Sequence, residues 1–311
     1  MRALLVFNPF ATSTSEHIKD QIARQLSTEL ELTVQPTEAR GEATELAKNA
    51  QSEGYELVIG YGGDGTINEL ANGLLHDGPN VQGPALAAIP GGNANVFARN
   101  LEFSTNPLQA TSQLIESVKR KHVKTIGVGK LTTPQDNRWF LFNSGFGIDA
   151  EVLAKMDERR QRGKRVTDNM YTAFALKALL DATKHREGSI TLATANGAEY
   201  NNLQFALVIN LAPWIYIGEI PIALTPEATL EKALSIYAHA DLSVPGIMHL
   251  VRNVFSRRTP ETNHRHIALD DQTSMHLHSS IPLWVQVDGE VLAQVHDVEM
   301  QYVPDALRII A

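Results

Sequence analysis

The chain of 311 residues contains no cysteine. This absence excludes disulfides, thiolate catalysis and zinc sites built on sulfur, and it fits a reducing compartment. Positive charge is also scarce, because 27 Lys and Arg stand against 35 Asp and Glu, giving a formal net charge of −8. A chain of that charge has no overall attraction for phosphate backbones. We therefore expect no nucleic-acid partner.

Long apolar runs are missing as well. The run before Asn8 is too short for the apolar core of a secretory signal. Residues 203–224 imitate a membrane span, but Pro213, Glu219 and Pro221 are among the residues that interrupt them, and a span needs ~20 nearly unbroken apolar residues. With 43% hydrophobic and 20% charged residues, the composition is typical of folded, water-soluble proteins. We expect a cytoplasmic protein without a transmembrane segment.

The arrangement of apolar residues predicts two domains of different class. The first 120 or so residues alternate helical patterns with short apolar runs, at Ala3–Phe7, Leu32–Val34, Leu57–Gly60 and Ala85–Ile89. This alternation indicates a parallel sheet with helices on both faces. From about Lys124, period-two alternation predicts a mostly antiparallel β-sandwich or barrel. Two helical segments interrupt it, at Ala150–Met156 and about Asp168–Lys184.

A glycine-rich turn follows the third apolar run. Gly60, Gly62, Gly63 and Gly65 surround Asp64, and a helical pattern follows. Glycines in such a turn allow unusual backbone angles and close approach to an anion, while the free N–H groups at a helix start attract phosphate. We interpret the segment as a phosphate-binding turn. An ordinary strand-to-helix turn is the alternative, but it would not need so many glycines.

Two other phosphate-binding motifs fit less well. The spacing of Gly60, Gly62 and Gly65 satisfies the dinucleotide fingerprint, but that motif normally follows the first strand. A P-loop is excluded because no lysine follows the glycines. A second apolar run ends in Pro90-Gly91-Gly92, with Asn95 beyond it. Since neighbouring strand-end loops of a parallel sheet form one crevice, we expect both turns to face the same ligand.

Taken in order, the motifs resemble the catalytic domain of the diacylglycerol kinase family, which includes bacterial lipid kinases and sphingosine kinases. The matching segments are Asn8-Pro9, Thr37 with Gly41-Glu42-Ala43, Gly62–Thr66 with Asn68-Glu69 and Asn72-Gly73, Pro90-x-Gly92-x-x-Asn95, Gly145–Glu151, Pro226-Glu227-Ala228 and Asp288-Gly289-Glu290. Gly-Gly-Asp-Gly alone is shared with NAD kinases and phosphofructokinases. The ordered set is much more specific and covers nearly the whole chain.

The resemblance implies an ATP-dependent lipid kinase that transfers the γ-phosphate to a hydroxyl of diacylglycerol or a related lipid. Its domains would be an ATP-binding α/β domain at 1–124, a β-sandwich acceptor domain at 125–299 and a C-terminal segment at 300–311 that returns to the first domain. ATP and Mg²⁺ would be bound, and the lipid would be met at a membrane surface by a peripherally associated protein. A homodimer is left open.

Individual roles follow from the same resemblance. The nucleotide contacts would be Asn8, Thr37, Gly62, Gly63, Asp64, Gly65, Thr66, Gly92 and Asn95. Asp64 would hold Mg²⁺ and serve catalysis, and Glu290 would be the general base. Asp149 would hold the polar end of the lipid. Helix capping is the structural alternative for Asp64, Thr66 and Asp149, and Asp288-Gly289 is by itself a two-residue hairpin signal.

Some positions depart from the family pattern. Val96 stands where diacylglycerol kinases usually have an Asp, and Leu230–Ala233 replaces the usual Asp-Asp-Gly. The first loop lacks its customary Ser-Gly. These departures keep a second hypothesis open, a catalytically weak lipid- or nucleotide-binding protein, and an NAD-kinase-like phosphotransferase is the third. The Asn68-Glu69 pair directly after the glycine turn argues against the NAD-kinase reading.

Two further features carry charge or metal-ligand chemistry. The basic run Arg159–Arg165 is interpreted first as a solvated connector and second as a contact for anionic lipid head groups. The pairs His264-x-His266 and His276-x-His278 would each share one strand face. Because no carboxylate follows at matching spacing, we expect surface strands here rather than metal sites.

Overall fold

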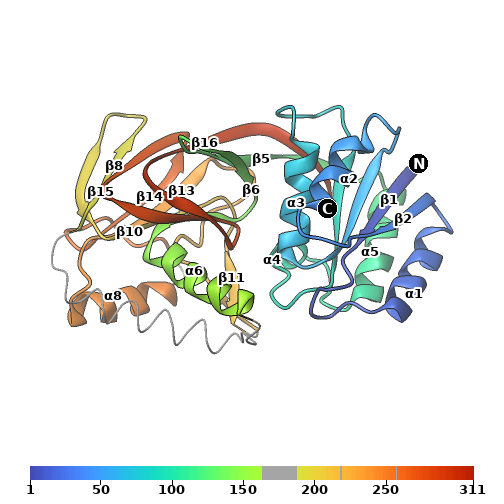
Figure 1. The fold of residues 1–311 in the computed structure, drawn as a ribbon, viewed down its shortest axis with the longest axis horizontal. Coiled ribbons are helices and arrows are strands. Elements are labelled where there is room, and N and C mark those ends of the chain that lie inside the picture. The colour runs from blue at the N-terminus through green and yellow to red at the C-terminus, as the bar shows by residue number, and fades with distance from the viewer. Residues whose placement is uncertain (163–187, 218, 257) are drawn as a thin grey trace. The chain divides into compact units, whose positions relative to one another are not determined.

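The computed structural model describes residues 1–162, 188–217, 219–256 and 258–311. These residues form two compact units, one of Met1–Val128 with Val303–Ala311 and one of Gly129–Tyr302. The bounds expected from the sequence are 1–124, 125–299 and 300–311. Strands β5 (Val123–Thr132) and β16 (Glu290–Ile310) each contribute residues to both units. The expected fold class is confirmed, with a parallel α/β unit and a mostly antiparallel unit (Figure 1).

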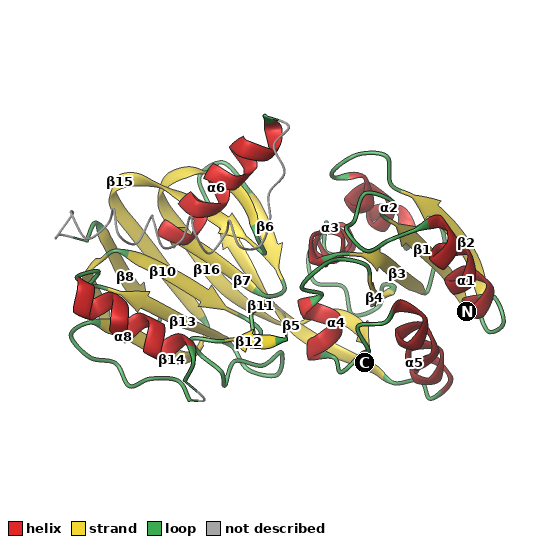
Figure 2. Cartoon of the chain, turned by 90° about the horizontal axis from the view of Figure 1, so that it is seen from below, coloured by secondary structure: helices red, strands yellow, loops and turns green. Residues whose placement is uncertain are grey.

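Unit 1 is a parallel sheet with the strand order β2-β1-β3-β4, beside which Ile309 of β16 pairs in parallel with Leu86. In chain order its elements are β1 (Arg2–Phe7), α1 (Glu16–Leu26), β2 (Glu31–Pro36), α2 (Glu42–Ala50), β3 (Leu57–Gly62), α3 (Asp64–Leu74), β4 (Ala85–Pro90), α4 (Val96–Asn100) and α5 (Pro107–Lys119). Helices α2 and α3 pack together on one face, and α1 and α5 on the other (Figure 2). Every residue of β3 and β4 is buried, as expected for central strands covered on both faces.

The carboxyl ends of these strands lie at one edge of the sheet. Phe7 pairs with both Pro36 and Tyr61, and Gly62 pairs with Pro90. The chain places β2 on one side of β1 and β3 on the other, so the strand order reverses between β1 and β3. In open α/β sheets a ligand crevice forms outside the carboxyl ends at such a reversal. The topology thus indicates that a ligand site would form at the segments that follow β1 and β3.

Unit 2 is built on an antiparallel sheet with the order β14-β13-β10-β7-β15-β16, and β8 pairs with β15 and β9. In chain order the elements are β6 (Asn137–Phe140), β7 (Asn143–Gly147), α6 (Ile148–Gln161), β8 (Ile190–Thr194), β9 (Glu199–Leu203), β10 (Phe205–Ile209), β11 (Ile215–Ile217), β12 (Ile220–Ile222), β13 (Leu234–His239), α8 (Val244–Val254), β14 (His266–Gln272) and β15 (Ser274–Val287). Strands β11 and β12 form a separate hairpin.

The core of unit 2 lies on both faces of this sheet. Along β10, Ala206 and Val208 belong to one hydrophobic cluster, while Leu207 on the opposite face belongs to another. Successive strand residues point to opposite faces, so this strand is buried on both sides. Helix α8 covers the second face and contributes Ile247 and Leu250 to its cluster. The alternating pattern of the sequence therefore predicts the strands correctly here, but the strand β10 has no face that is exposed to solvent.

The segment that imitates a membrane span is a buried strand followed by a loop and a hairpin. It comprises β10 and the β11–β12 pair. Within the described residues, no helix is long and apolar enough to cross a membrane. The helix expected at Ala150–Met156 is the longer α6. The helix expected at about Asp168–Lys184 lies outside the described residues.

Candidate nucleotide and acceptor sites

Asn8, directly after β1, joins the first loop to the glycine turn after β3. Its Nδ2 donates to Oγ1 of Thr66 at 3.1 Å, and its Oδ1 accepts from the N–H of Phe10 at 2.9 Å. Its own N–H donates to the carbonyl of Tyr61 at 3.0 Å. Thr66 lies in the first turn of α3 and is 5% exposed, so its hydroxyl is engaged by Asn8 rather than capping that helix.

The two glycine turns pack directly against each other. The N–H of Gly91 donates to the carbonyl of Gly62 at 2.8 Å. A Cβ at Gly92 would come within 2.6 Å of Cα of Gly63, and one at Gly62 within 2.6 Å of Oγ1 of Thr66. Close approach between protein segments is therefore what demands glycine at these positions.

The expectation that the glycines of the first turn adopt unusual backbone angles was wrong. Positive φ occurs at other glycines, and Gly60, Gly62, Gly63 and Gly65 are not among them. A side chain at Gly60 would collide with Ile67 at 2.6 Å, so this glycine serves helix packing on the strand. Gly65 has open space where a Cβ would stand, and no side chain caps α3 at Gly63. The described residues therefore leave the space beside Gly65 open, and the backbone N–H groups of a helix start favour an anion.

Asp64 connects the starts of two helices. It is the first residue of α3, and its Oδ1 accepts from the N–H of Phe97 in α4 at 3.1 Å. Burial raises the pKa of its carboxyl group, while hydrogen bonds from the backbone of Val96, Phe97 and Asn95 act in the opposite direction. The capping role considered for Asp64 is thus fulfilled toward α4, the helix after the second glycine turn.

Asn95 and Thr37 complete this edge of the sheet. Asn95 has a left-handed backbone with φ of 48°, and its side chain closes the second turn by bonding both the N–H of Gly92 at 2.8 Å and its carbonyl at 2.7 Å. Thr37 follows β2, is 5% exposed, and donates its N–H to the carbonyl of Phe7 at 2.8 Å. All the predicted nucleotide contacts therefore lie at or just beyond the carboxyl ends of β1 to β4.

In unit 2, the β15–β16 hairpin turns at Asp288 and Gly289. Both residues have positive φ, 47° and 85°, as a two-residue turn of this hand requires, and Val287 pairs with Glu290. The carboxylate of Asp288 also accepts hydrogen bonds from the N–H groups of Leu141, Phe142 and Asn143, at 2.7 to 2.9 Å. Asp288 is therefore both a turn residue and the anchor of the segment between β6 and β7.

Glu290, the first residue after this turn, is ion-paired. Its Oε2 accepts from Nη2 of Arg138 in β6 at 2.8 Å. The two side chains are 29% and 24% exposed, so the pair is partly shielded from water. The pairing fixes the position of the carboxylate.

A polar network links Asp149 to the same hairpin. Helix α6 begins at Ile148, so Asp149 lies inside its first turn rather than before it. Its Oδ2 accepts from Nε2 of Gln286 at 2.9 Å, and Gln286, which is 1% exposed, also bonds Oδ1 of Asn143 and the N–H of Gly289. The structure thus brings Asp149 and the Asp288–Glu290 turn into one hydrogen-bonded assembly.

Sequence reasoning missed three members of this assembly, namely Arg138, Asn143 and Gln286. A signal existed for Gln286, which is a polar residue within the apolar strand segment Trp284–Val287. Arg138 and Asn143 carried no comparable signal, because their partners are distant in sequence.

Comparison with known proteins shows which family the first unit is similar to. Residues 2–131 match the family model described as the diacylglycerol kinase catalytic domain. The resemblance to this family is confirmed. A diacylglycerol kinase from Staphylococcus carnosus is 32% identical over 155 residues, which are 49% of this chain and 46% of that protein. A diacylglycerol kinase from Staphylococcus aureus is 34% identical over 144 residues, 45% of this chain and 42% of that protein. The matches thus span less than half the length of these relatives.

Solved structures extend the likeness of fold to the whole chain. A crystal structure of a diacylglycerol kinase from Bacillus anthracis has a TM-score of 0.72 at 22% identity and covers 99% of this chain and 96% of that one. An NAD kinase from Archaeoglobus fulgidus, solved in complex with ATP, has a TM-score of 0.55 at 13% identity and covers 100% and 94%. Both likenesses concern the fold.

The histidine pairs and the basic run lie apart from these sites. His276 and His278 share an exposed strand face and both contact Asp297, at 3.3 and 2.8 Å. The expectation that His264 and His266 share a strand face was wrong, because β14 begins at His266, which is buried, while His264 is an exposed loop residue. The basic run enters the end of α6, and its part from Gly163 onward lies outside the described residues.

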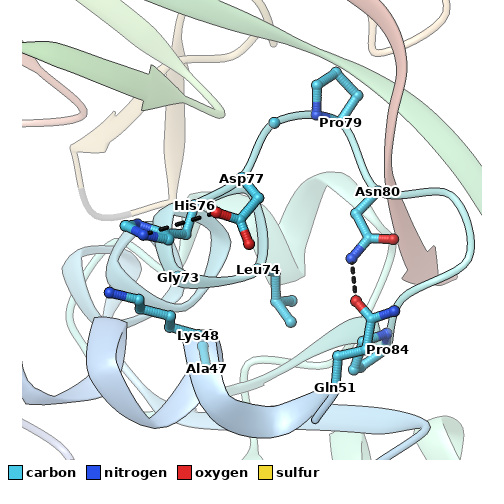
Figure 3. Close-up of a pocket in the computed structure, with 11 residues that line it drawn as sticks. Ala47, Lys48, Gln51, Gly73, Leu74, His76, Asp77, Pro79, Asn80 and Pro84 are labelled. Atoms are coloured by element: carbon cyan, nitrogen blue, oxygen red, sulfur yellow. Dashed lines mark hydrogen bonds and ion pairs between the residues drawn. The ribbon is translucent and has the colours of Figure 1, made fainter.

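A small pocket of unit 1 lies away from the glycine turns. It has about 130 Å³ and is lined by Lys48, Gln51, Leu74, Asp77 and Asn80, among others (Figure 3). Leu74 ends the helix that Asp64 begins, so the pocket is at the opposite edge of the sheet from the predicted nucleotide contacts. It therefore plays no part in the candidate site.

Proposed function

We propose that the protein is an ATP-dependent lipid kinase that transfers the γ-phosphate of ATP to a hydroxyl of diacylglycerol or a related lipid. The observation that carries this proposal is the convergence of Asn8, the Gly62–Thr66 turn and the Gly92–Asn95 turn at the strand-order reversal of a sheet whose sequence matches the diacylglycerol kinase catalytic domain. The fold likeness to an NAD kinase alone does not favour a dinucleotide acceptor.

The phosphates of ATP would lie at the start of α3. Its first turn has no side-chain cap, and Gly65 has no neighbour in the space that a Cβ would occupy. Backbone N–H groups at such a helix start hold phosphate oxygens and favour negative charge. Asn8 and Asn95 would act chiefly by fixing the loops around this position, because their side chains are engaged in the turns.

The residues of unit 1 fit a magnesium ion bound together with phosphate. Asp64 supplies a partly buried carboxylate beside the anion site, and its backbone hydrogen bonds hold it in place. Mg²⁺ usually takes one or two protein carboxylates together with substrate phosphates. When bound, the ion would neutralise phosphate charge. Val96, where a second carboxylate would stand in many relatives, is buried and apolar, so Asp64 would act without that neighbour.

In unit 2, Glu290 would take the proton of the acceptor hydroxyl. The bond from that oxygen to phosphorus forms as the bond from phosphorus to the β,γ-bridging oxygen breaks, ADP leaves, and the proton passes to the carboxylate. A hydroxyl of pKa ~15 is not ionised in advance by a carboxylate, so the proton moves late in the reaction. Arg138 would hold Glu290, and Asp149, already bonded to Gln286, would bind the polar end of the lipid.

A direct transfer assay tests this proposal. Labelled ATP and magnesium would be incubated with the full chain and with diacylglycerol, other hydroxyl lipids or NAD, the lipids in mixed micelles. We expect labelled lipid from the wild type and a loss of at least about 100-fold in Asp64→Asn and Glu290→Gln. Glu299→Gln, an exposed glutamate on the same strand β16, is the matched control. Labelling of NAD alone, or undiminished transfer in Glu290→Gln, would refute the assignment.

A further inference from the structure

Helix α8 of unit 2 exposes an apolar stripe. Val244, Met248 and Val251 of the helix, and Phe255 just beyond its end, are 62%, 70%, 50% and 61% exposed. Their spacing of four, three and four residues places them on one side of the helix. Figure 2 shows the helix beside β13 and β14.

The stripe is not needed to pack α8 onto its own unit. The opposite side of the helix already supplies Ile247 and Leu250 to the core, and Asn253 there donates to the hydroxyl of Tyr237 at 3.1 Å. The helix is therefore apolar on two faces, of which the sheet uses one. A contiguous exposed apolar surface of this kind marks an interaction site.

The charge beside the stripe is positive, although the whole chain is acidic. Helix α8 contains no Asp or Glu, and Arg252 and Arg258 are exposed next to Val251 and Phe255. Of the nearby acids, Asp241 is paired with Arg265 at 3.7 Å, and Glu227 accepts from the N–H of Thr259 at 3.2 Å. The local balance therefore favours an anionic partner.

A polar pocket opens at the end of the same helix. It has about 520 Å³, and Phe255 of the stripe belongs to its wall. Its polar lining includes His249, Arg252, Asn253, Arg258, Glu261 and His266. Among the described residues of this lining, Glu261 is the one acidic side chain, against Arg252 and Arg258. The pocket is large enough for a phosphate head group.

His266 gives this pocket an unsatisfied polar group. Its ring is 1% exposed, and no described residue meets hydrogen-bond distance and angle at either nitrogen. Burial lowers the pKa of the ring, and the backbone of Glu261 acts in the opposite direction. Nε2 of His249, which also lines the pocket, is buried without a partner too. Either tautomer of a neutral imidazole carries one N–H donor, and a buried donor gains by bonding an acceptor oxygen.

We propose that α8 and this pocket form a docking site for a bilayer that contains anionic phospholipid. The four apolar side chains enter the interface, as those of a surface-lying amphipathic helix do, and a phosphate head group enters the pocket against Arg252, Arg258 and the ring N–H of His266. The combination favours a membrane over a protein partner. The apolar stripe matches the acyl-chain region of a lipid leaflet, and the cationic polar pocket matches its anionic head groups. The site is independent of the proposed kinase activity.

Vesicle sedimentation with the full chain tests the proposal. Vesicles of phosphatidylcholine alone would be compared with vesicles containing about one third phosphatidylglycerol at physiological salt. We expect binding to the anionic vesicles, weakened at least about tenfold in Met248→Ser/Phe255→Ser and about fivefold for each arginine changed in Arg252→Gln/Arg258→Gln. Ile281→Ser, at an isoleucine on β15 that is 54% exposed, and Arg120→Gln in unit 1 are the controls. All these positions are on the surface, and thermal melting would check folding.

Further measurements separate the alternatives. His266→Gln, which retains a side-chain N–H donor, should preserve the preference for anionic vesicles that His266→Phe loses. Inorganic phosphate at millimolar concentration should compete only weakly. The proposal is overturned if the stripe and arginine variants bind vesicles like the wild type, or if phosphate binds tightly while vesicles do not. It is equally overturned if Met248→Ser/Phe255→Ser abolishes self-association in analytical ultracentrifugation without changing vesicle binding.

Discussion

Arg138 and Glu290 form a partly shielded ion pair in unit 2, with 2.8 Å between Nη2 and Oε2. Ion pairs near the surface usually add little stability, so we expect this pair to matter chiefly through the orientation it gives to Glu290. Its value to the protein is therefore expected in the rate of reaction rather than in the free energy of unfolding.

Replacing Arg138 should slow transfer without weakening nucleotide binding. If Glu290 is the general base, Arg138 positions it, and we expect Arg138→Met to lower kcat about tenfold, equivalent to about 1.4 kcal/mol, with the KM for ATP unchanged. Arg138→Lys should restore part of the loss. Steady-state kinetics with both substrates measure this, and a changed KM for ATP with normal kcat would contradict the positioning role.

Removing the carboxylate of Asp288 should destabilise unit 2. Asp288→Ala leaves the N–H groups of Leu141, Phe142 and Asn143 without their acceptor and puts alanine at φ of 47°. We expect a loss of roughly 3 kcal/mol or more in the free energy of unfolding. Asp288→Asn should cost less, since asparagine tolerates this backbone and retains one acceptor oxygen. Urea denaturation of both variants gives the comparison, and equal losses would argue against the anchoring role.

The two glycine turns should respond differently to alanine. A Cβ at Gly92 meets Cα of Gly63 at 2.6 Å, so Gly92→Ala should destabilise unit 1 by about 1–3 kcal/mol. Gly65 lies in α3 with open space around it, so Gly65→Ala should keep or raise Tm. If the phosphates of ATP lie there, the same Gly65→Ala raises the KM for ATP. Thermal melting and kinetics on both variants check this. A Tm of Gly92→Ala equal to that of the wild type would contradict the packing argument.

Acid should destabilise unit 2 through His239. Burial lowers its pKa to about 4, helped by the neighbouring His266, while the backbone and carboxylate of Asp241 oppose the shift. In the unfolded chain the imidazole of His239 is protonated below about pH 6.5, whereas in the folded protein it stays neutral down to about pH 4. The free energy of unfolding therefore falls as the pH decreases through this window.

The variant His239→Gln should therefore lose less stability between pH 7 and pH 4.5 than the wild type does. Its Tm at pH 7 should still be lower, because Nδ1 of His239 bonds the hydroxyl of Tyr237 at 3.0 Å. The matched control is His276→Gln, an exposed histidine of β15. Parallel pH slopes for wild type and His239→Gln would contradict the linkage.

The order of strands and turns was predictable because its signals are local. The apolar runs at Ala3–Phe7 and Ala85–Ile89 are β1 and β4, and Asp288-Gly289 is the hairpin turn that its residue types indicate. Family motifs also marked the segments that carry the candidate site. The helix faces were harder, since α8 is apolar on two sides and periodicity cannot say which one the sheet covers.

The sequence by itself determined which residue types are available, where strands and turns form, and that cysteine chemistry is absent. Tertiary structure alone decided the partners, since Asp64 bonds a residue 33 positions away and Glu290 one 152 positions away. It also decided why glycine is needed, because at Gly92 the cause is contact between two turns from different strands, and at Gly60 it is the packing of α3 on β3. Such contacts depend on the strand order of the sheet, and no local pattern encodes them.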